Sequence, residues 1–300
     1  MSRSSSKPKR RQPQTGKVEG AWLLKALVAA VVVAIVCTYL TLCLVFSWSE
    51  WQLVLHPAQT SAIESPQAPL IHFDPGDSGQ PQLTGVWLPA PPEGHYKDFT
   101  ILFLPGGDGS LANFAATQTA LQQMGMNVFA FDYRGYGKSA TTHPNERRMI
   151  EDSEAAWTYL TQTRRISPST ILPYGVGVGA SLATRLTKAH AEIPGVMLDS
   201  PYADLGDVVL KDPRFRLLPV GLLFQEDFPL SRPLAQLTKP KLLLVREPNS
   251  EPASYFSAAD PKRIVVLKAD DIPGFDQSIT RFLDEYVPVP SAAPASTKAN

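Results

Sequence analysis

Three glycines between an apolar run and a helical pattern mark the place where this chain has the spacing for covalent catalysis. In Ile171–Ala183 the apolar run ends at Tyr174, and Gly175, Gly177 and Gly179 follow it. The motif G-x-S-x-G at a strand-to-helix turn presents a serine for attack on a carbonyl, because the tight turn leaves no room for flanking side chains. Here Gly177 stands where that serine is expected. The layout for acyl-transfer chemistry is present, and the nucleophile is missing.

A second glycine-rich stretch, Pro105-Gly106-Gly107-Asp108-Gly109-Ser110, follows the apolar run Phe99–Leu104. Backbone N–H groups in such a loop can face a ligand, and an oxyanion hole is built in this way. A flexible strand-to-helix turn is an equally good interpretation of the loop by itself. The loop is not a nucleotide-phosphate loop, because it lacks the G-K-[ST] ending.

Two further stretches connect these glycines to a known family. Phe131–Ser139 reads FDYRGYGKS, and Leu198–Leu205 reads LDSPYADL. Together with the glycine elbow they resemble the α/β-hydrolase superfamily, and in particular its membrane-anchored branch of lysophospholipid- and palmitoyl-protein-hydrolase relatives. The resemblance covers roughly residues 50–287 and implies an α/β fold with a doubly wound, mostly parallel sheet. It also implies that the glycines and the arginine of RGYGKS shape a loop and are not catalytic.

The resemblance implies three catalytic positions, and none carries the expected residue. The nucleophile position falls on Gly177, the acid position on Asn249 (with Glu247 and Glu251 near it), and the histidine position on Asp271. The superfamily orders its triad as serine, acid, histidine. No histidine follows His190 in this chain, so a triad in that order is impossible. The resemblance therefore leads us to expect a degenerate triad and an inactive domain.

Two other uses of this region stay open. Gly106, Gly107 and Val178 stand where the superfamily's oxyanion donors stand, so their amides could form a polar pocket for a carbonyl or a carboxylate. Ser181, in a G-x-S-x-A string, would become a nucleophile if the elbow were shifted by four residues. We favour a packing role for Ser181, because it lies one turn into the expected helix.

The sequence offers little for a metal or a cofactor. Asp270 and Asp271 could suggest a carboxylate pair, but adjacent loop residues usually point apart and no third ligand is evident. Both cysteines, Cys37 and Cys43, lie in an apolar segment near the N-terminus. The remainder therefore has no thiol for a disulfide, a zinc site or catalysis. We expect no metal and no cofactor.

The N-terminal region predicts a membrane anchor. Residues 26–48 are 23 residues without a charge, and at ~1.5 Å per residue they would span about 35 Å. The run is too long for a cleaved signal peptide and lacks a small-x-small cleavage site. We place the anchor at residues 21–49, where it would contact membrane lipid.

The charges on either side of the anchor predict its orientation. Residues 1–25 carry a net charge of +6 and the remainder −6. The positive-inside rule therefore places the disordered basic tail, residues 1–20, in the cytoplasm and the domain on the extracytoplasmic side. An acidic body also argues against nucleic acid as a partner.

Strands alternate with helices through residues 50–287, as in a parallel α/β sheet. Residues 201–240 read as a short, Pro-rich cap, and residues 288–300 as a disordered tail. The predicted strands are Leu70–Phe73, Leu83–Leu88, Phe99–Leu104, Asn127–Tyr133, Thr170–Tyr174, Gly195–Asp199, Lys241–Arg246 and Arg263–Leu267. The predicted helices are Leu111–Met124, Asn145–Arg165, one from the elbow to about Glu192, and Phe275–Tyr286.

Three functions fit these observations. The first is a single-pass membrane protein whose inactive hydrolase-like domain binds an acyl- or lipid-type ligand or a protein partner. The second is a membrane-bound serine hydrolase for esters, thioesters or lysolipids that uses an unconventional residue such as Ser181. The third is a scaffold that acts through its membrane helix and basic tail. Loss of all three triad residues on a preserved frame favours the first, because little catalysis survives without a nucleophile and a base.

Overall fold

The computed structural model describes residues 20–58, 69–74, 76, 79–201, 204–211, 213–248 and 253–287. Contacts divide the chain into two units, Met1–Ser47 and Trp48–Asn300. The predicted tails, except Gly20, and the acid position Asn249 lie outside the described residues.

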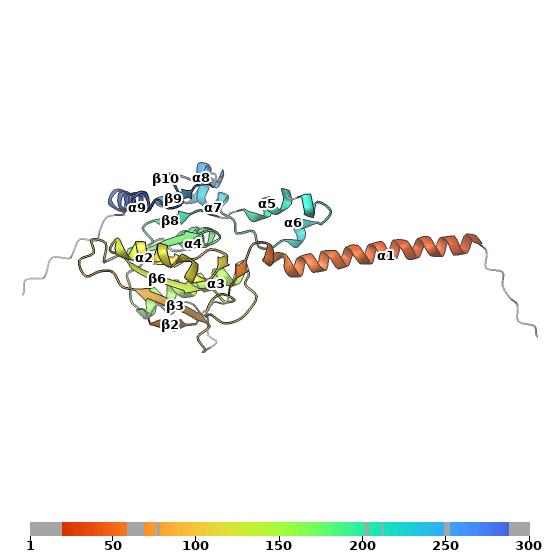
Figure 1. Cartoon of the computed structure of the whole chain (residues 1–300), viewed down its shortest axis with the longest axis horizontal. Coiled ribbons are helices and arrows are strands. Elements are labelled where there is room, and N and C mark those ends of the chain that lie inside the picture. The colour runs from red at the N-terminus through yellow and green to blue at the C-terminus, as the bar shows by residue number, and fades with distance from the viewer. Residues whose placement is uncertain are drawn as a thin grey trace, which may run out of the picture. The chain divides into compact units, whose positions relative to one another are not determined.

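The first unit contains nearly all of one long helix, α1, which runs from Gly20 to Ser49 (Figure 1). By length and apolar composition α1 could cross a membrane, and a signal sequence can have the same length and composition. The predicted anchor therefore corresponds to a continuous helix. A short 3₁₀ turn, η1 (Glu50–Leu53), follows it at the start of the second unit.

The second unit is built on an eight-stranded sheet in the order β10-β9-β8-β7-β4-β6-β3-β2. Strands β2–β3 and β3–β6 pair antiparallel, and the other neighbours pair parallel. A separate parallel pair joins β1 (His56–Pro57) to β5 (Asp108–Gly109). The strands of the large sheet are β2 Leu70–Phe73, β3 Leu83–Leu88, β4 Thr100–Leu104, β6 Asn127–Asp132, β7 Ile171–Val176, β8 Val196–Asp199, β9 Lys241–Arg246 and β10 Lys262–Leu267. The predicted α/β fold with a mostly parallel sheet is confirmed.

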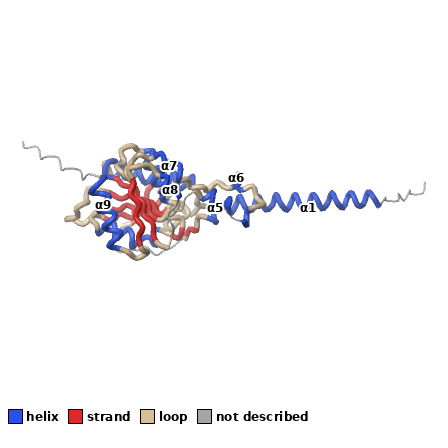
Figure 2. The backbone as a smooth tube through the Cα atoms, turned by 90° about the horizontal axis from the view of Figure 1, so that it is seen from above, coloured by secondary structure: helices blue, strands red, loops and turns tan. Residues whose placement is uncertain are grey.

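Helices cover both faces of the sheet, which passes through the middle of the domain (Figure 2). Leu121 of α2 and Phe282 of α9 pack on one face, and Met149 of α3 and Ala183 of α4 pack on the other. The central strands are buried on both sides, so they read as continuous apolar runs. The helices and turns are η2 Leu111–Phe114, α2 Ala115–Gln123, α3 Glu146–Thr158, η3 Tyr159–Thr163, η4 Pro168–Thr170, α4 Gly179–Ala189, α8 Ala253–Ser257 and α9 Ile272–Tyr286.

The cap, residues 201–240, is more helical than the sequence predicts. Its described elements are α5 Leu205–Lys211, η5 Pro213–Phe215, α6 Val220–Leu223 and α7 Ser231–Gln236. All four are short, so they carry too few turns to show a helical period in the sequence. Hydrogen bonds close the base of the cap: Asp227 accepts the amide of Gly206, and Asp204 accepts the amide of Leu230.

The RGYGKS loop is held by buried ionic contacts. Arg134 donates from Nε to Asp152 Oδ1 (2.6 Å) and from its amide to Asp152 Oδ2 (2.8 Å). Asp132 accepts the amide of Leu111 (2.8 Å), so the same loop fixes the start of η2. Gly137 has φ +48° and lies against the Asp132 carboxylate, where a Cβ would clash. These contacts give the loop a supporting role for the strand ends around it.

We expect Arg134→Ala to destabilise the domain by about 3–5 kcal/mol, because it leaves the fully buried Asp152 carboxylate without its cation. Urea unfolding followed by tryptophan fluorescence measures the loss. The control is Arg147→Ala on α3, the helix that carries Asp152; loss of its exposed pair with Glu151 should change stability by less than about 1 kcal/mol. Equal effects of the two changes would contradict a supporting role for Arg134.

Candidate functional site

The glycine elbow keeps the backbone geometry of a nucleophile turn. Strand β7 ends at Val176, α4 begins at Gly179, and Gly177 between them has φ +56°. A Cβ on Gly175 would lie 2.7 Å from Ala180 Cα, and one on Gly179 would lie 2.7 Å from Pro105 O. These distances are too short for real contacts, so both flanking glycines are required by the close approach of strand, helix and loop.

Gly177, the apex of the elbow, has only backbone atoms. The amide of Gly177 donates to the carbonyl of Asp199 (3.1 Å), which ties the apex to the end of β8. No acceptor among the described residues takes the N–H of Val178, whose side chain is fully buried. At the position where the superfamily places a nucleophile, this chain therefore has no side-chain atom that could attack a carbonyl.

The glycine-rich loop lies beside the elbow, as the sequence predicts, but an apolar segment covers it. An ideal Cβ on Gly107 would lie 3.4 Å from Val178 Cγ2 and 3.0 Å from Leu55 Cδ2. Leu55 is almost completely buried, and the amide of His56 donates to Gly107 O (2.7 Å). Gly106, Gly107, Gly177 and Val178 are themselves buried. The pocket expected at these residues stays a prediction, and in this structure β1 and its flanks lie over the loop.

The structure describes the predicted histidine position, Asp271, and the neighbour of the predicted acid position, Glu247. Asp271 caps α9, accepting the amide of Gly274 (2.9 Å). Glu247 donates its amide to Leu267 O (2.8 Å), whereas Asn249 and Glu251 lie outside the described residues. Ser181 is buried and donates from Oγ to Pro229 O (2.7 Å), so the structure places it in the packing between α4 and the cap.

One histidine lies near the glycine-rich loop, and the sequence gives no sign of its partner. His56 Nδ1 lies 2.7 Å from Asp108 Oδ1, because β1 and β5 bring these residues into register. A carboxylate that orients a histidine is one half of a general-base arrangement. Both side chains are exposed, however, whereas the elbow apex is buried. The pairing spans 52 residues, and only the formation of β1 reveals it.

A buried ionic network and a cavity lie at the ends of β7, β8 and β9. Asp199 accepts the hydroxyl of Tyr174 (2.7 Å) and the guanidinium of Arg246 (2.8 Å). Burial, and then the charge of Asp199, raises the pKa of Tyr174. Arg246 also faces a cavity of about 300 Å³ between α2 and α9. The cavity is lined by Ala116, Thr117, Ala120, Arg246, Ala269, Asp270, Ile272 and Phe275.

Three carboxylates form hydrogen bonds at the segment of the cap between α6 and α7. Glu50 accepts the amide of Gln225 (3.1 Å), Glu146 accepts the amide of Phe228 (2.9 Å), and Glu226 accepts the amide of Glu146 (2.5 Å). Burial, together with the nearby charges of Glu146 and Glu50, raises the pKa of Glu226 to about 7. Within the described part of the chain, no group of three or more His, Cys, Asp or Glu side chains is placed to hold a metal ion.

We expect Gly179→Ala to destabilise the domain by more than about 2 kcal/mol, because the new methyl group meets carbonyl oxygens of the Leu104–Pro105 loop. Thermal unfolding measures the change. Gly221→Ala in α6 is the matched control, since its Cβ would meet nothing within 4 Å. An unchanged unfolding temperature in Gly179→Ala would show that the elbow has room for a methyl group.

The raised pKa of Glu226 predicts a pH-dependent stability. The folded state keeps a proton that the unfolded chain releases, so the free energy of unfolding should fall as pH rises from about 4.5 to about 7. Glu226→Gln keeps an acceptor for the Glu146 amide and carries no charge, so it should raise Tm at pH 8 and flatten the decline. The exposed Glu93→Gln is the control. If the free energy of unfolding fell equally with rising pH in both variants, the charge of Glu226 would not be the cause.

Comparisons with known proteins place the chain in a family. A family profile described as serine aminopeptidase, S33, matches residues 96–272. An uncharacterized protein of Mycobacterium tuberculosis is 26% identical over 277 residues, covering 88% of this chain and 93% of that protein. Human alpha/beta hydrolase domain-containing protein 17B is 28% identical over 147 residues, covering 49% of this chain and 48% of that protein.

Solved structures agree with the fold. An esterase from Pyrococcus furiosus superposes with a TM-score of 0.58 at 19% identity, covering 78% of this chain and all of the esterase. At this identity the similarity shows the fold and leaves the activity open. With the family match over most of the domain and the elbow geometry described above, the chain belongs to the serine aminopeptidase S33 family of the α/β-hydrolase superfamily.

Proposed function

We propose that this chain is a single-pass membrane protein whose hydrolase-like domain is catalytically inactive and binds an acyl- or lipid-type ligand or a protein partner. The observation that carries the proposal is Gly177 at the apex of an otherwise intact elbow, with φ +56°. A left-handed backbone strains a serine and suits a glycine. The change at this position therefore removes the nucleophile and relaxes the turn at the same time.

The partners of a nucleophile support the same proposal. All five histidines precede β9 and β10 in the sequence, so the loops that would supply the acid and the base contain no histidine. His190 pairs with Glu154 (2.8 Å) and stacks on Trp157, far along α4 from the elbow. Without a base, a serine at the apex would stay protonated and react slowly.

The cavity between α2 and α9 supports an amphiphilic ligand. Its walls include the apolar side chains of Ala120 and Phe275. Arg246 adds a cation whose charge Asp199 partly balances, and Asp270 adds an acid. This combination suits a small acyl compound with a carbonyl head. In this proposal the ligand binds in the cavity and not at the buried amides of Gly107 and Val178.

The membrane assignment is part of the proposal. Helix α1 would anchor the protein by contact with membrane lipid, with the basic tail in the cytoplasm and the domain on the opposite side. Nucleic acid is not among the proposed partners, because the part of the chain after the tail is acidic.

We expect the purified full-length protein to show no labelling by a fluorophosphonate probe above a heat-denatured sample. It should also show no turnover of p-nitrophenyl esters, thioesters or lysophosphatidylcholine above buffer. Gly177→Ser should add at most a small rate, because the new hydroxyl has no histidine base and the residual catalysis of a damaged triad is only ~10³–10⁴-fold over water.

The same assay decides the alternative, a serine hydrolase with an unconventional site. Labelling of the native protein that disappears on denaturation would overturn the proposal. If Ser181→Ala then abolished the labelling, Ser181 would be the nucleophile, and loss of turnover in His56→Gln would identify the His56–Asp108 pair as its base.

A further inference from the structure

The cap presents three strongly exposed leucines within 13 residues. Leu210 of α5 is 57% exposed, Leu217 after η5 is 85% exposed, and Leu222 of α6 is 79% exposed. A single exposed leucine is ordinary on a protein surface, but several on neighbouring short elements mark an interaction surface. We call Leu210, Leu217 and Leu222 the cap leucines.

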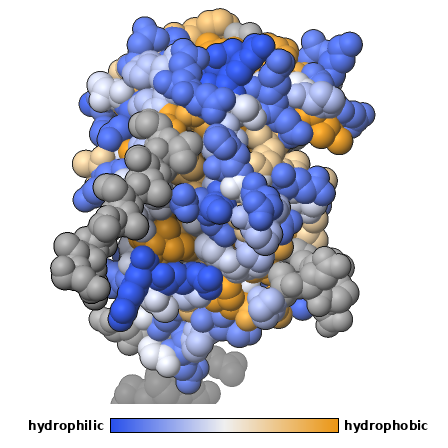
Figure 3. All heavy atoms as spheres, turned by 90° about the vertical axis from the view of Figure 1, so that its left-hand side faces the viewer, coloured by the Kyte–Doolittle hydropathy of each residue, from blue (hydrophilic) through white to orange (hydrophobic). Residues whose placement is uncertain are grey.

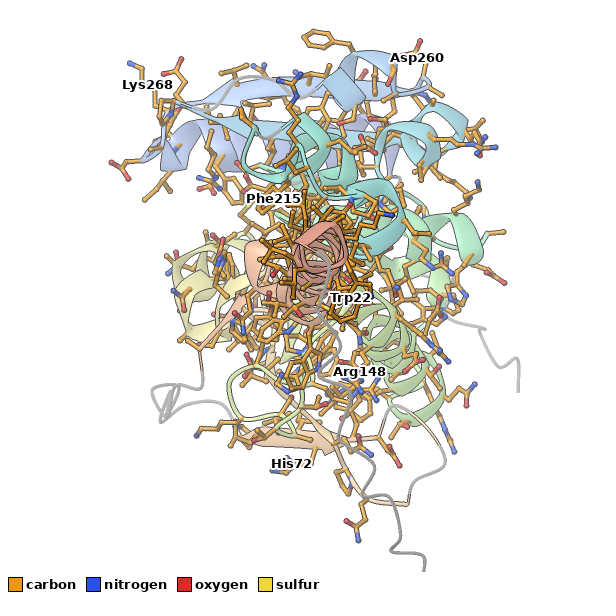
Figure 4. All side chains as sticks on the ribbon, turned by 90° about the vertical axis from the view of Figure 1, so that its right-hand side faces the viewer. Trp22, His72, Arg148, Phe215, Asp260 and Lys268 are labelled. Carbon is orange, nitrogen blue, oxygen red and sulfur yellow. The ribbon has the colours of Figure 1, made fainter. Side chains whose placement is uncertain are left out.

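Helices α5 and α6, which carry Leu210 and Leu222, lie at one end of the domain (Figures 1 and 2). Figure 4 looks onto this end, with Phe215 of η5 above the middle of the view and His72 of β2 in its lower part. Figure 3 shows the opposite face, where described side chains are mostly hydrophilic and apolar ones form small separate areas. The exposed apolar groups of the cap are thus set apart from a largely polar face.

A hydrogen bond ties the cap to the point where the chain leaves α1. Glu50, the residue after the end of α1, is buried and accepts the amide of Gln225 (3.1 Å). Leu222 precedes Gln225 by three residues, which span at most about 11 Å of chain. If α1 lies in a bilayer, the Glu50 contact keeps this part of the cap within a short distance of the membrane surface.

The composition of the cap suits an interface between lipid and water. Residues 201–240 carry five basic and five acidic residues, so the leucines stand among charges of both signs. Apolar side chains interspersed with charged ones suit the headgroup layer of a bilayer. Trp48, two residues before Glu50, is also strongly exposed, and an indole at this position suits the membrane interface.

A cavity opens beside the cap leucines. It holds about 260 Å³ between α5 and α6 and is lined by Gly206, Leu210, Val220, Gly221, Phe224 and Asp227. Leu210 both lines this cavity and is exposed, so the hollow adjoins the apolar surface. An acyl chain that leaves the bilayer at the cap would meet apolar walls there.

We propose that the cap is a membrane-docking surface, with the cap leucines inserted into the interfacial layer of the same bilayer that α1 spans. The occupant is the phospholipid surface of that bilayer, and the Glu50–Gln225 contact keeps the cap close to the end of the membrane helix. This inference rests on the membrane anchoring in the proposed function, and it is independent of whether the domain is catalytic.

Depth-dependent fluorescence quenching in vesicles tests the proposal on the full-length chain. Cys37→Ala and Cys43→Ala remove the two native thiols, and single cysteines at Leu217→Cys or Leu222→Cys then carry the dye NBD. The vesicles contain phosphatidylcholine, phosphatidylglycerol and a lipid with a nitroxide just below its headgroup. Phe256→Cys on α8, 63% exposed and outside the cap, is the matched control, and Val33→Cys in α1 reports anchoring.

We expect the probes at 217 and 222 to be quenched at least threefold more than the probe at 256, with blue-shifted emission. Quenching at 217 and 222 no greater than at 256, while the probe at 33 is shielded from water, would overturn the docking surface and leave the anchor standing. A water-exposed probe at 33 would overturn the anchor, and the docking surface with it.

Discussion

The close packing of β7, α4 and the Leu104–Pro105 loop is the constraint on which the rest of the site depends. Gly175 and Gly179 have no space for a side chain, so the strand must turn into the helix within two residues. This turn places Gly177 beside the glycine-rich loop and at the carbonyl of Asp199. The family frame persists because packing requires it, independently of catalysis.

The glycines that flank the elbow and the glycine at its centre answer to different physical constraints. The flanking glycines and the Arg134–Asp152 contact support the fold, and replacing them costs stability. Gly177 has no side chain to pack, and its left-handed backbone is easier for glycine than for serine. The packing of the elbow therefore does not require a serine at its centre.

The segment after α1 covers the glycine-rich loop. Leu55 packs against Gly107, His56 pairs with Asp108, and Glu50 holds the cap through Gln225. Three successive parts of one short segment thus contact the loop and the cap. In the proposed arrangement this segment connects the membrane helix to the cap and to the glycine-rich loop.

The sequence alone determined the fold class and most strands, and it predicts a degenerate triad. The buried strand Lys241–Arg246 contains the apolar run Leu242–Val245, and the absence of histidine after His190 is visible without coordinates. Only the tertiary structure decided the rest. Asp271 caps α9, which therefore begins at Ile272, three residues before the predicted start. The His56–Asp108 pair joins residues 52 positions apart, and the Glu50–Gln225 hydrogen bond joins residues 175 positions apart. The burial of Leu55 also depends on distant segments. Local patterns report local backbone preference and burial, whereas these contacts exist only after distant segments have packed together.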